Sequence, residues 1–340
     1  APDQVSPSKF FTAKVSKQIA ELRGWNWSRI MIILHYWIAV VIVFQIVAGS
    51  FTVVFLSYLR IKLATVPIGL VYLAFAVVGL AMFLIPIIPG VPVYLTGGII
   101  LTDASLAESL GGGTSGYVWA CVWAVTICFA IKLLAVVMQQ KGIGERLGNK
   151  VWVRSMVNVN SATMRSIRYL LTRPGLNVPK VTILVGGPDW PTSVTTGILR
   201  LDVREMLIGT LPVFFLITPT TLAGAFMLKA SHAASVNDGT SNVLCRETSA
   251  ASIVADDSSP WTSISDISIL CTGLVQGLGL IAAAYYIEKT TAHADDELDA
   301  MPYDEEVLEI ERAEAHRNEL MRAIMHWDEL SPNARRTLVM

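Results

Sequence analysis

The clearest candidate for chemistry in this sequence is Asp189, a carboxylate inside an otherwise apolar stretch, residues 181–199. A charged side chain at membrane depth is costly, and it is normally kept because it lines a transport path or contacts a substrate. We therefore predict a functional role for Asp189. The alternative is a hairpin whose turn is exposed to water, in which Asp189 only caps the next helical turn.

Proline and glycine interrupt this stretch around Asp189, and they interrupt one other apolar stretch, residues 86–101. Proline ends a helix and removes a backbone donor, so carbonyl and amide groups are freed at each break. In a membrane, such groups are tolerated only where protein buries them or a water-filled cavity lies beside them. Both stretches are therefore predicted to be re-entrant hairpins or broken helices.

The two breaks are similar to each other. When they are aligned on Pro92 and Pro191, both continue to a Thr-Gly pair, Thr96-Gly97 in the first and Thr196-Gly197 in the second, one residue apart in spacing. A repeat at this scale is typical of transporters built from two related halves, which bind substrate near the bilayer midplane. Helix N-termini carry partial positive charge, so the breaks suit an anionic headgroup or phosphate.

Charged residues follow the second break. Asp202 and Glu205 fit a variant of the capping box and predict the start of the next helix. Arg200 has three open roles, which are an ion pair with Asp189, binding of lipid phosphate, and anchoring at the membrane interface. We favour the last of these.

The elements that must position these residues are long apolar helices. The chain is 53% hydrophobic and 16% charged, with a mean hydropathy of +0.54, whereas soluble domains carry about 25% charged residues. A membrane-spanning helix needs about 20 mostly apolar residues. The stretches that fit are 30–57, 67–88, 117–138, 206–229 and 262–287. We predict an all-α, polytopic transmembrane helical bundle over residues 30–290, with two re-entrant hairpins.

Loop charges indicate the topology. Residues 139–180, called here the basic connection, contain one acid, Glu145, and the basic residues Lys141, Arg146, Lys150, Arg154, Arg165, Arg168, Arg173 and Lys180. The positive-inside rule places this connection on the cytoplasmic side. The loops 102–116 and 230–261 hold almost no Lys or Arg and are expected on the opposite side, which leaves the C-terminus cytoplasmic. The orientation of the first span stays open, and so does the organelle, for which an endomembrane and a plastid both fit.

Both ends of the chain lie outside the predicted bundle. Residues 1–29 are basic and fit either an amphipathic helix on an anionic membrane face or a disordered arm. A first residue other than Met favours a processed or truncated N-terminus. Residues 291–340, called here the acidic tail, have no Lys or Arg over 295–311, and Pro302 ahead of Asp304 predicts a helix start.

An apolar stripe at helical spacing follows in the acidic tail, formed by Val307, Ile310, Ala313, Leu320, Ile324 and Trp327. We expect a cytoplasmic helix that docks on a partner. In the last apolar stretch, Gly273 and Gly277 form a GxxxG step, a weak signal for close helix packing.

The second half of the apolar region resembles a known family. Residues 181–225 contain Gly-Pro-Asp-Trp-Pro, Thr-Gly-Ile, Gly209-Thr210, Pro212 and Ala223-Gly224. This series resembles the second half of the VTT-domain proteins, the DedA / SNARE-associated Golgi protein family. The Pro89-Gly90-Val91-Pro92 run, then Gly116 and a span ending in a Gly-rich basic loop, is similar to the family's first half. The resemblance covers residues 67–229.

The resemblance implies a polytopic protein with two oppositely inserted re-entrant hairpins that moves lipids, as a scramblase or flippase acting on phospholipids or lipid-phosphate carriers. By position, the hairpin residues it implies are Pro89, Gly90, Pro92, Pro188, Asp189 and Pro191. Our predicted substrate path adds Tyr94, Thr96, Trp190 and Arg200 to this set. Bacterial members place an acid in the first hairpin, where this chain offers only Tyr94 and Thr96. They also place an arginine just before the second hairpin, where Lys180 is the nearest cation. A passive scramblase therefore fits better than strict proton coupling.

Two other classes of function are alternatives. One is a membrane scaffold, in which the basic connection and the acidic tail recruit partners and the breaks serve packing alone. An enzyme is disfavoured, because the sequence has no nucleophile elbow, HExxH motif or P-loop, and its histidines lack metal-ligand spacing. We expect no cofactor and no metal. The predicted partners are membrane lipids, a protein that binds the tail, and a second copy of the chain; the net charge of −1 speaks against nucleic acid.

Overall fold

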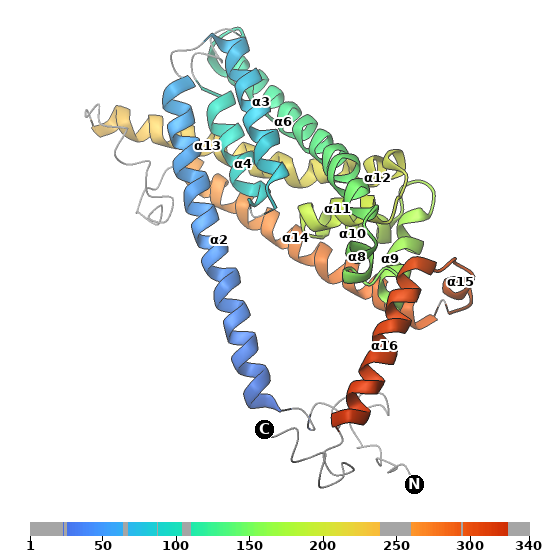
Figure 1. Ribbon diagram of the computed structural model, residues 1–340. Helices are drawn as coiled ribbons and strands as arrows, with labels where there is room; N and C mark the ends of the chain where they lie inside the picture. Colours follow the sequence, from blue (N-terminus) through green and yellow to red (C-terminus); the bar gives the residue numbers. More distant parts are fainter. Residues whose placement is uncertain are drawn as a thin grey trace, which may run out of the picture. The chain divides into compact units, whose positions relative to one another are not determined.

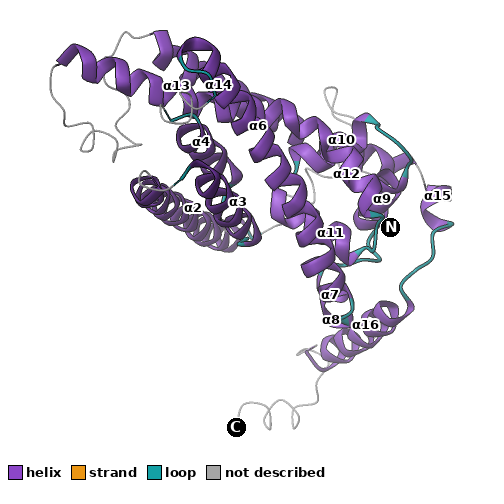
Figure 2. Ribbon diagram, turned by 90° about the horizontal axis from the view of Figure 1, so that it is seen from above, coloured by secondary structure: helices purple, strands orange, loops and turns teal. Residues whose placement is uncertain are grey.

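The protein is helical throughout the part of the chain that the structure, a computed structural model, describes: residue 23 and residues 26–63, 67–86, 88–103, 110–238, 260–293 and 295–325 (Figures 1 and 2). Within these ranges the regular elements are α2 (Trp27–Leu63), α3 (Ile68–Leu84), α4 (Gly90–Leu101), α6 (Gly113–Val137), the π-helix η1 (Met138–Gly144), α7 (Glu145–Gly148), α8 (Val151–Met156), α9 (Ala162–Thr172), α10 (Val178–Gly186), α11 (Asp189–Ile198), α12 (Val203–Thr210), the 3-10 helix η2 (Leu211–Val213), α13 (Phe214–Asp238), α14 (Pro260–His293), α15 (Asp295–Asp299) and α16 (Glu305–Met325). The predicted all-α class is confirmed.

Three helical stretches are long and apolar enough to cross a membrane: Gly113–Gly148, Val203–Ala230 and Pro260–His293. They contain the predicted stretches 117–138, 206–229 and 262–287, and they support an integral membrane protein. The other two predicted stretches are helical as well. The stretch 30–57 lies within α2, and 67–88 is shortened because α3 ends at Leu84, where the first break begins.

The chain divides into two compact units, residues 1–52 and 53–340. The first contains the beginning of α2, where many large apolar side chains are exposed, among them Ile32, Tyr36 and Trp37. Residues 1–22 of the predicted basic N-terminal segment lie outside the described residues. Everything below concerns the second unit.

Both predicted breaks are helix–turn–helix hairpins. In the first hairpin, α3 and α4 are joined by residues 85–89, and Pro89 directly precedes α4. In the second hairpin, Gly187 and Pro188 join α10 to α11. At 1.5 Å per residue, the 12 residues of α4 and the 10 residues of α11 extend about 18 Å and 15 Å, well short of a bilayer core of about 30 Å. The prediction of interrupted helices is confirmed.

Each hairpin packs on the long helix of the other half of the repeat. Helix α4 crosses α13 where Gly98 lies against Thr221, and α11 crosses η1, the continuation of α6, where Gly197 lies against Gly144. A side chain at these glycines would meet backbone, so only glycine allows the helices to approach so closely. Two buried apolar clusters result, one around α4 and one around α11.

The two long helices run antiparallel to each other. Near the start of α6 the Tyr117 hydroxyl donates to the Ala225 carbonyl (3.0 Å), and further along it Phe129 packs on Phe214, with ring centroids 5.6 Å apart. Sequence numbers therefore rise along α6 as they fall along α13. This opposed direction agrees with two related halves inserted in opposite orientations.

Helix α14 covers α13 and then α10. Its hydroxyl groups contact α13, where Ser265 donates to the Ala223 carbonyl (3.1 Å) and Thr272 lies 3.1 Å from Thr220. Its closest glycine contact is Gly279 against Gly186 of α10. The predicted GxxxG step makes no such contact with the described residues, because a Cβ at Gly273 or Gly277 would meet nothing within 4 Å.

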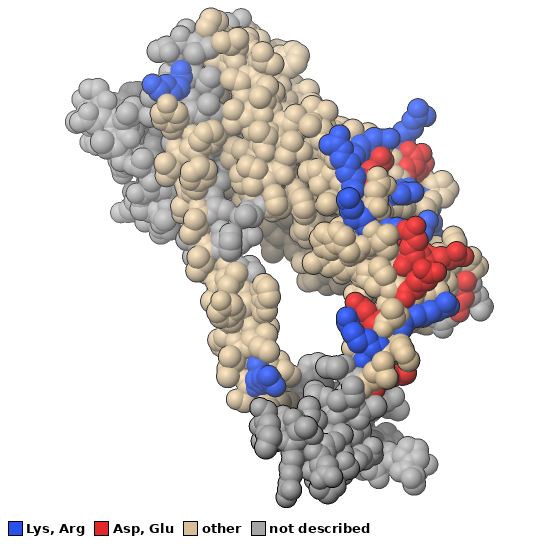
Figure 3. Space-filling view, viewed as in Figure 1, with Lys and Arg blue, Asp and Glu red and all other residues tan. Residues whose placement is uncertain are grey.

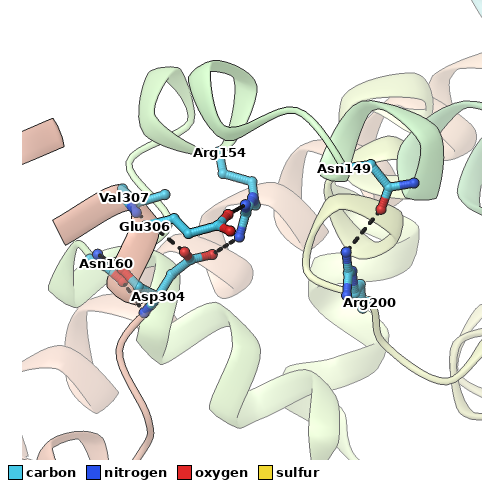
Figure 4. Close-up of polar contacts among 7 residues, drawn as sticks. All are labelled: Asn149, Arg154, Asn160, Arg200, Asp304, Glu306 and Val307. Atoms are coloured by element: carbon cyan, nitrogen blue, oxygen red, sulfur yellow. Dashed lines mark hydrogen bonds and ion pairs between the residues drawn. The ribbon is translucent and has the colours of Figure 1, made fainter. Parts of the chain in front are cut away.

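The acidic tail docks on the basic connection of its own chain. Arg154 of α8 forms ion pairs with Asp304 and Glu306 (Figure 4). Partial desolvation lowers the pKa of the Arg154 guanidinium, but hydrogen bonds to Glu306 and Asp304 outweigh it and raise the pKa above its ordinary value. Figure 3 shows most of the charged side chains of this face on the side of these elements, with a few basic side chains apart from them, while the surface over α3 and α6 carries almost none.

The start of α16 is fixed by the same contact. Asp304 caps the helix by accepting from the Val307 amide (3.3 Å), and its own amide donates to Asn160 Oδ1 (2.9 Å), so the helix start predicted after Pro302 is confirmed. Of the predicted apolar stripe, Val307 is buried and Leu320 is 51% exposed. The Ile324 side chain and Trp327 lie outside what the structure describes.

Candidate functional site at the hairpin junction

The turns of the two hairpins meet, and we call this place the hairpin junction. The Trp190 indole N–H donates to the Leu84 carbonyl at the end of α3 (3.2 Å). A Cβ built on Gly90 would lie 3.1 Å from Asp189 Oδ2 and 3.2 Å from the Tyr94 ring. Residues as far apart in the sequence as Leu84 and Trp190, 106 positions, are therefore in contact. Gly90, which has no side chain, leaves room for the Asp189 carboxylate beside the Tyr94 ring.

A buried ion pair lies at the hairpin junction. Lys132 Nζ of α6 is 2.7 Å from Asp189 Oδ1, and the two side chains are 2% and 29% exposed. The ammonium also lies 5.6 Å from the centroid of the Phe83 ring, an attractive cation–π arrangement. Because an unpaired charge in apolar surroundings is costly, each partner depends on the other, and Lys132 depends more since it is almost fully enclosed.

The local sequence explains why the carboxylate stands there. Asp189 is the first residue of α11, where the partial positive charge of the helix N-terminus stabilises an anion. Pro188 and Pro191 flank it at no cost in hydrogen bonds, because the first-turn amides of a helix have no partner within the helix. The run Pro-Asp-Trp-Pro thus ends the hairpin turn, begins α11 and presents the carboxylate to α6.

Tyr94 completes the hairpin junction from the side of α4. Its ring packs on Phe83 with centroids 5.4 Å apart, and the side chain is 2% exposed. Its hydroxyl is buried and has no hydrogen-bond partner among the described residues. Since buried hydroxyls are normally paired, Tyr94 Oη is a donor available to a polar group at the junction.

Two buried glutamines in η1 hold the ends of both hairpins. Gln139 donates to the Phe83 carbonyl near the end of α3 (2.6 Å), and Gln140 donates to the Leu201 carbonyl just after α11 (2.8 Å). The π-helical turn places two successive side chains on opposite hairpins, and such π segments occur frequently at functional sites. The α6–η1 segment therefore ties the hairpins together at three positions, Lys132, Gln139 and Gln140.

A second buried ion pair lies away from the hairpin junction. Lys180 is fully buried, and its Nζ is 2.9 Å from Glu205 Oε2. Glu205 also accepts from the Gly175 amide (3.1 Å). The predicted capping box is therefore right for Asp202, which accepts from the Arg204 amide (2.9 Å), and wrong for Glu205, which pairs with Lys180 instead.

The structure brings some of the predicted path residues together and separates others. Gly90, Tyr94, Asp189 and Trp190 meet at the hairpin junction, while Pro89 and Pro188 precede the two helices that begin there. Pro92 lies in the first turn of α4, and Pro191 is exposed in the first turn of α11. Thr96 lies farther along α4.

Arg200 lies away from the hairpin junction, beyond the far end of α11. It donates to Asn149 Oδ1 (2.9 Å; Figure 4), so the structure does not form the ion pair with Asp189 that was one of its three open roles; the favoured role, anchoring at the membrane interface, stays a prediction. The residue has a φ of 53°, the left-handed conformation that lets the chain leave α11 sharply.

The residue that the sequence analysis missed is Lys132. Its signal was present, because a lysine stands alone in the apolar stretch 117–138, and an ionisable residue within a span marks a functional site by default. The sequence signal for Gln139 and Gln140 as buried hairpin contacts is weaker, since they follow that stretch directly and are the first residues of the basic connection.

The arrangement offers a cation, an anion and a hydroxyl side by side. Lys132 can donate three hydrogen bonds, Asp189 can only accept while ionised, and Tyr94 can do both. In the described part of the chain, no three His, Cys, Asp or Glu side chains come close enough to hold a metal ion. No protein-family model, curated protein or solved structure matches the chain, so the function of the hairpin junction is argued from its geometry.

Proposed function

We propose that the protein moves lipids or lipid-phosphate headgroups across the bilayer, with the hairpin junction as the polar part of the path. The observation that carries this proposal is the Lys132–Asp189 pair at the meeting point of two interrupted helices. The pair offers opposite charges to a lipid headgroup: the ammonium suits a phosphate, and the carboxylate suits an amine. The resemblance to VTT-domain proteins supports the same activity.

The lengths of the helices support re-entrant insertion of both hairpins. Helices α4 and α11 are too short to cross the hydrocarbon core, and Lys132 lies near the middle of the candidate span Gly113–Gly148. A hairpin that enters from one side and turns next to Lys132 therefore ends near the midplane. The antiparallel directions of α6 and α13 would bring the two hairpins in from opposite sides, the basic connection and the C-terminus being cytoplasmic.

Transport on this proposal requires the hairpin turns to separate. Tyr94 and Lys132 are both about 2% exposed, so a headgroup reaches them only after the junction opens. A headgroup that carries both a phosphate and an amine offsets the cost of breaking the pair, because its phosphate pairs with Lys132 and its amine with Asp189, and neither charge is left without a partner. No second titratable pair at the junction is required, which agrees with passive movement.

Lipid movement in liposomes tests the proposal. The Asp189→Ala variant, reconstituted with a fluorescent phospholipid, is expected to exchange lipid between leaflets at least about 10-fold more slowly than the wild type, because a charge-assisted hydrogen bond contributes about 1.5–3 kcal/mol. Glu145→Gln is the matched control, since Glu145 is 41% exposed and pairs only loosely with Lys141, whose Nζ lies 3.8 Å from Glu145 Oε1. Equal exchange by wild type and Asp189→Ala, with both monodisperse by size-exclusion chromatography, contradicts the proposal.

The alternative function is a scaffold that recruits partners through the basic connection and the acidic tail, and deleting the tail distinguishes it from a transporter. Arg154 and Arg165 already hold the start of the tail, Arg165 by donating to the Met301 carbonyl (3.1 Å) and stacking 3.8 Å from the centroid of the Tyr303 ring. Deleting residues 295–340 is expected to leave lipid exchange near the wild-type rate. Loss of a cellular function with unchanged exchange in liposomes would favour the scaffold.

A further inference from the structure

A groove runs between α6 and α13 on the outside of the helices, with a volume of about 360 Å³. Its walls are lined by Tyr117, Val118, Cys121, Val122, Val125, Thr126, Phe214, Thr218, Leu222 and Phe226. The two threonine hydroxyls are not free to face a ligand, because Thr126 donates to the Val122 carbonyl and Thr218 to the Phe214 carbonyl, each at 2.8 Å. The groove therefore presents an almost entirely apolar surface.

In a membrane, the groove would face the hydrocarbon of the bilayer. It lies on two of the three stretches that are long and apolar enough to cross a membrane, and large apolar side chains beside it are exposed, among them Trp119 (55%) and Phe215 (76%). Along α6 it extends from Tyr117 to Thr126, about 14 Å at 1.5 Å per residue. That is roughly half of a hydrocarbon core of about 30 Å, the depth of one leaflet.

A cation lies at one end of the groove. Lys229 Nζ is 4.6 Å from the centroid of the Tyr117 ring and 4.1 Å from that of Trp261. Tyr117 is held by its hydrogen bond to Ala225, and Phe226 packs on Trp261 with ring centroids 5.7 Å apart. Tyr117 and Phe226 thus belong both to the groove wall and to the aromatic surroundings of the lysine.

The aromatic rings attract the ammonium but do not neutralise it. Within the described ranges, Lys229 forms no ion pair, whereas Lys132 and Lys180 each have an acid partner. A half-buried cation at the end of an apolar groove is complementary to a molecule with an anionic head and an apolar chain.

We propose that this groove and Lys229 bind an anionic phospholipid, with one acyl chain in the groove and the phosphate on Lys229. Tyr117 lies near the start of α6, while the basic connection follows its end, so the lipid belongs to the leaflet opposite the basic connection. The site is separate from the hairpin junction, because Tyr117 and Lys132 are about 22 Å apart along α6. The proposal does not depend on lipid transport by the protein.

Native mass spectrometry of the purified full chain in detergent tests the proposal, with phosphatidylglycerol as the probe. Lys229→Gln is expected to weaken phosphatidylglycerol binding about 10-fold, and Lys229→Arg is expected to retain it, since hydrogen bonds to charged groups are the strong ones. Lys289→Gln is the matched control: Lys289 also lies beside an aromatic ring, 5.8 Å from the centroid of Tyr285, but the groove is not lined by it. Leu222→Trp, which fills the groove, is expected to weaken binding independently of charge.

Three further results would each overturn the proposal. The first is an equal loss of binding in Lys229→Gln and Lys289→Gln, which would indicate a general charge effect. The second is equally tight binding of diacylglycerol, which has the chains but lacks the phosphate. The third is displacement of the lipid by equimolar glycerol 3-phosphate, which would make Lys229 a site for free anions. Monodisperse elution of every variant keeps misfolding from imitating a loss of binding.

Discussion

Replacing the ion pair at the hairpin junction with two apolar residues, Lys132→Met together with Asp189→Leu, is expected to give a protein as stable as the wild type that no longer moves lipid. Desolvation of a buried ion pair can exceed the attraction between its charges, and apolar replacements of similar volume are often neutral or stabilising, by up to about 1–4 kcal/mol; here the argument applies chiefly to Lys132, since Asp189 is partly exposed. Lys132 is 2% exposed and lies against Phe83, so a methionine there is well surrounded. The double variant lacks both the ammonium and the carboxylate that would bind the lipid headgroup, so lipid movement is expected to stop.

The single variants separate folding from function at this pair. Asp189→Leu leaves Lys132 buried and uncompensated and is expected to cost about 3–5 kcal/mol. Lys132→Met is expected to cost less, because Asp189 is 29% exposed and keeps part of its hydration. Thermal unfolding in detergent gives the order of stability, and leaflet exchange of a fluorescent lipid gives the activity. Wild-type exchange by the double variant would remove the pair from the transport path.

Gly98→Ala is expected to be the most damaging small substitution in the bundle. The added Cβ would lie 2.9 Å from the Ala225 amide nitrogen and closer still to the Thr221 carbonyl oxygen. Both atoms are backbone atoms of α13, so no side chain can rotate away, and α4 and α13 must move apart. Overpacking of this kind costs about 1–3 kcal/mol or more, and we expect the upper end of that range, measured as a lower midpoint of thermal unfolding.

Gly273→Ala is the matched control for that prediction. A Cβ at Gly273 of α14 meets nothing within 4 Å, so alanine is expected to stabilise the helix by about 0.8–1 kcal/mol, the difference in helix propensity. A Gly98→Ala protein as stable as the wild type would show that α4 and α13 do not cross at the distance described.

The sequence predicts the elements well because their causes are local. Proline and glycine at 86–92 and 186–191 mark the two interruptions directly, since the helix must end where the backbone lacks a donor. The start of α16 is likewise predicted locally, from Pro302 and the acids Asp304, Glu305 and Glu306 that come after it. Asp189 is predicted to be a site residue because a charge in an apolar stretch is costly, and this prediction needs no knowledge of its neighbours.

The partners of these residues could not be predicted, because they depend on tertiary packing. The sequence shows that Asp189 needs a cation, but it does not show that the cation is Lys132 rather than Arg200, which is much nearer in the chain. The same limit applies to the tail, whose Asp304 and Glu306 pair with Arg154 of the same chain; a protein that binds the tail helix stays a prediction. Glycine patterns mislead in a related way: Gly273 and Gly277 match a packing motif and meet open space, while Gly98 and Gly224 match none and form the closest crossing.

The packing of each hairpin on the long helix of the other half has a consequence for biosynthesis. Leu95 of α4 packs on Gly224 of α13, and this partner surface is synthesised long after α4 has left the ribosome. At about 5–20 residues per second, the first hairpin waits roughly ten seconds for its partner. During this interval α3 and α6 can already pack on α4, but the face of α4 that α13 covers has no partner in the chain, so the first hairpin reaches its final packing only after α13 has been made.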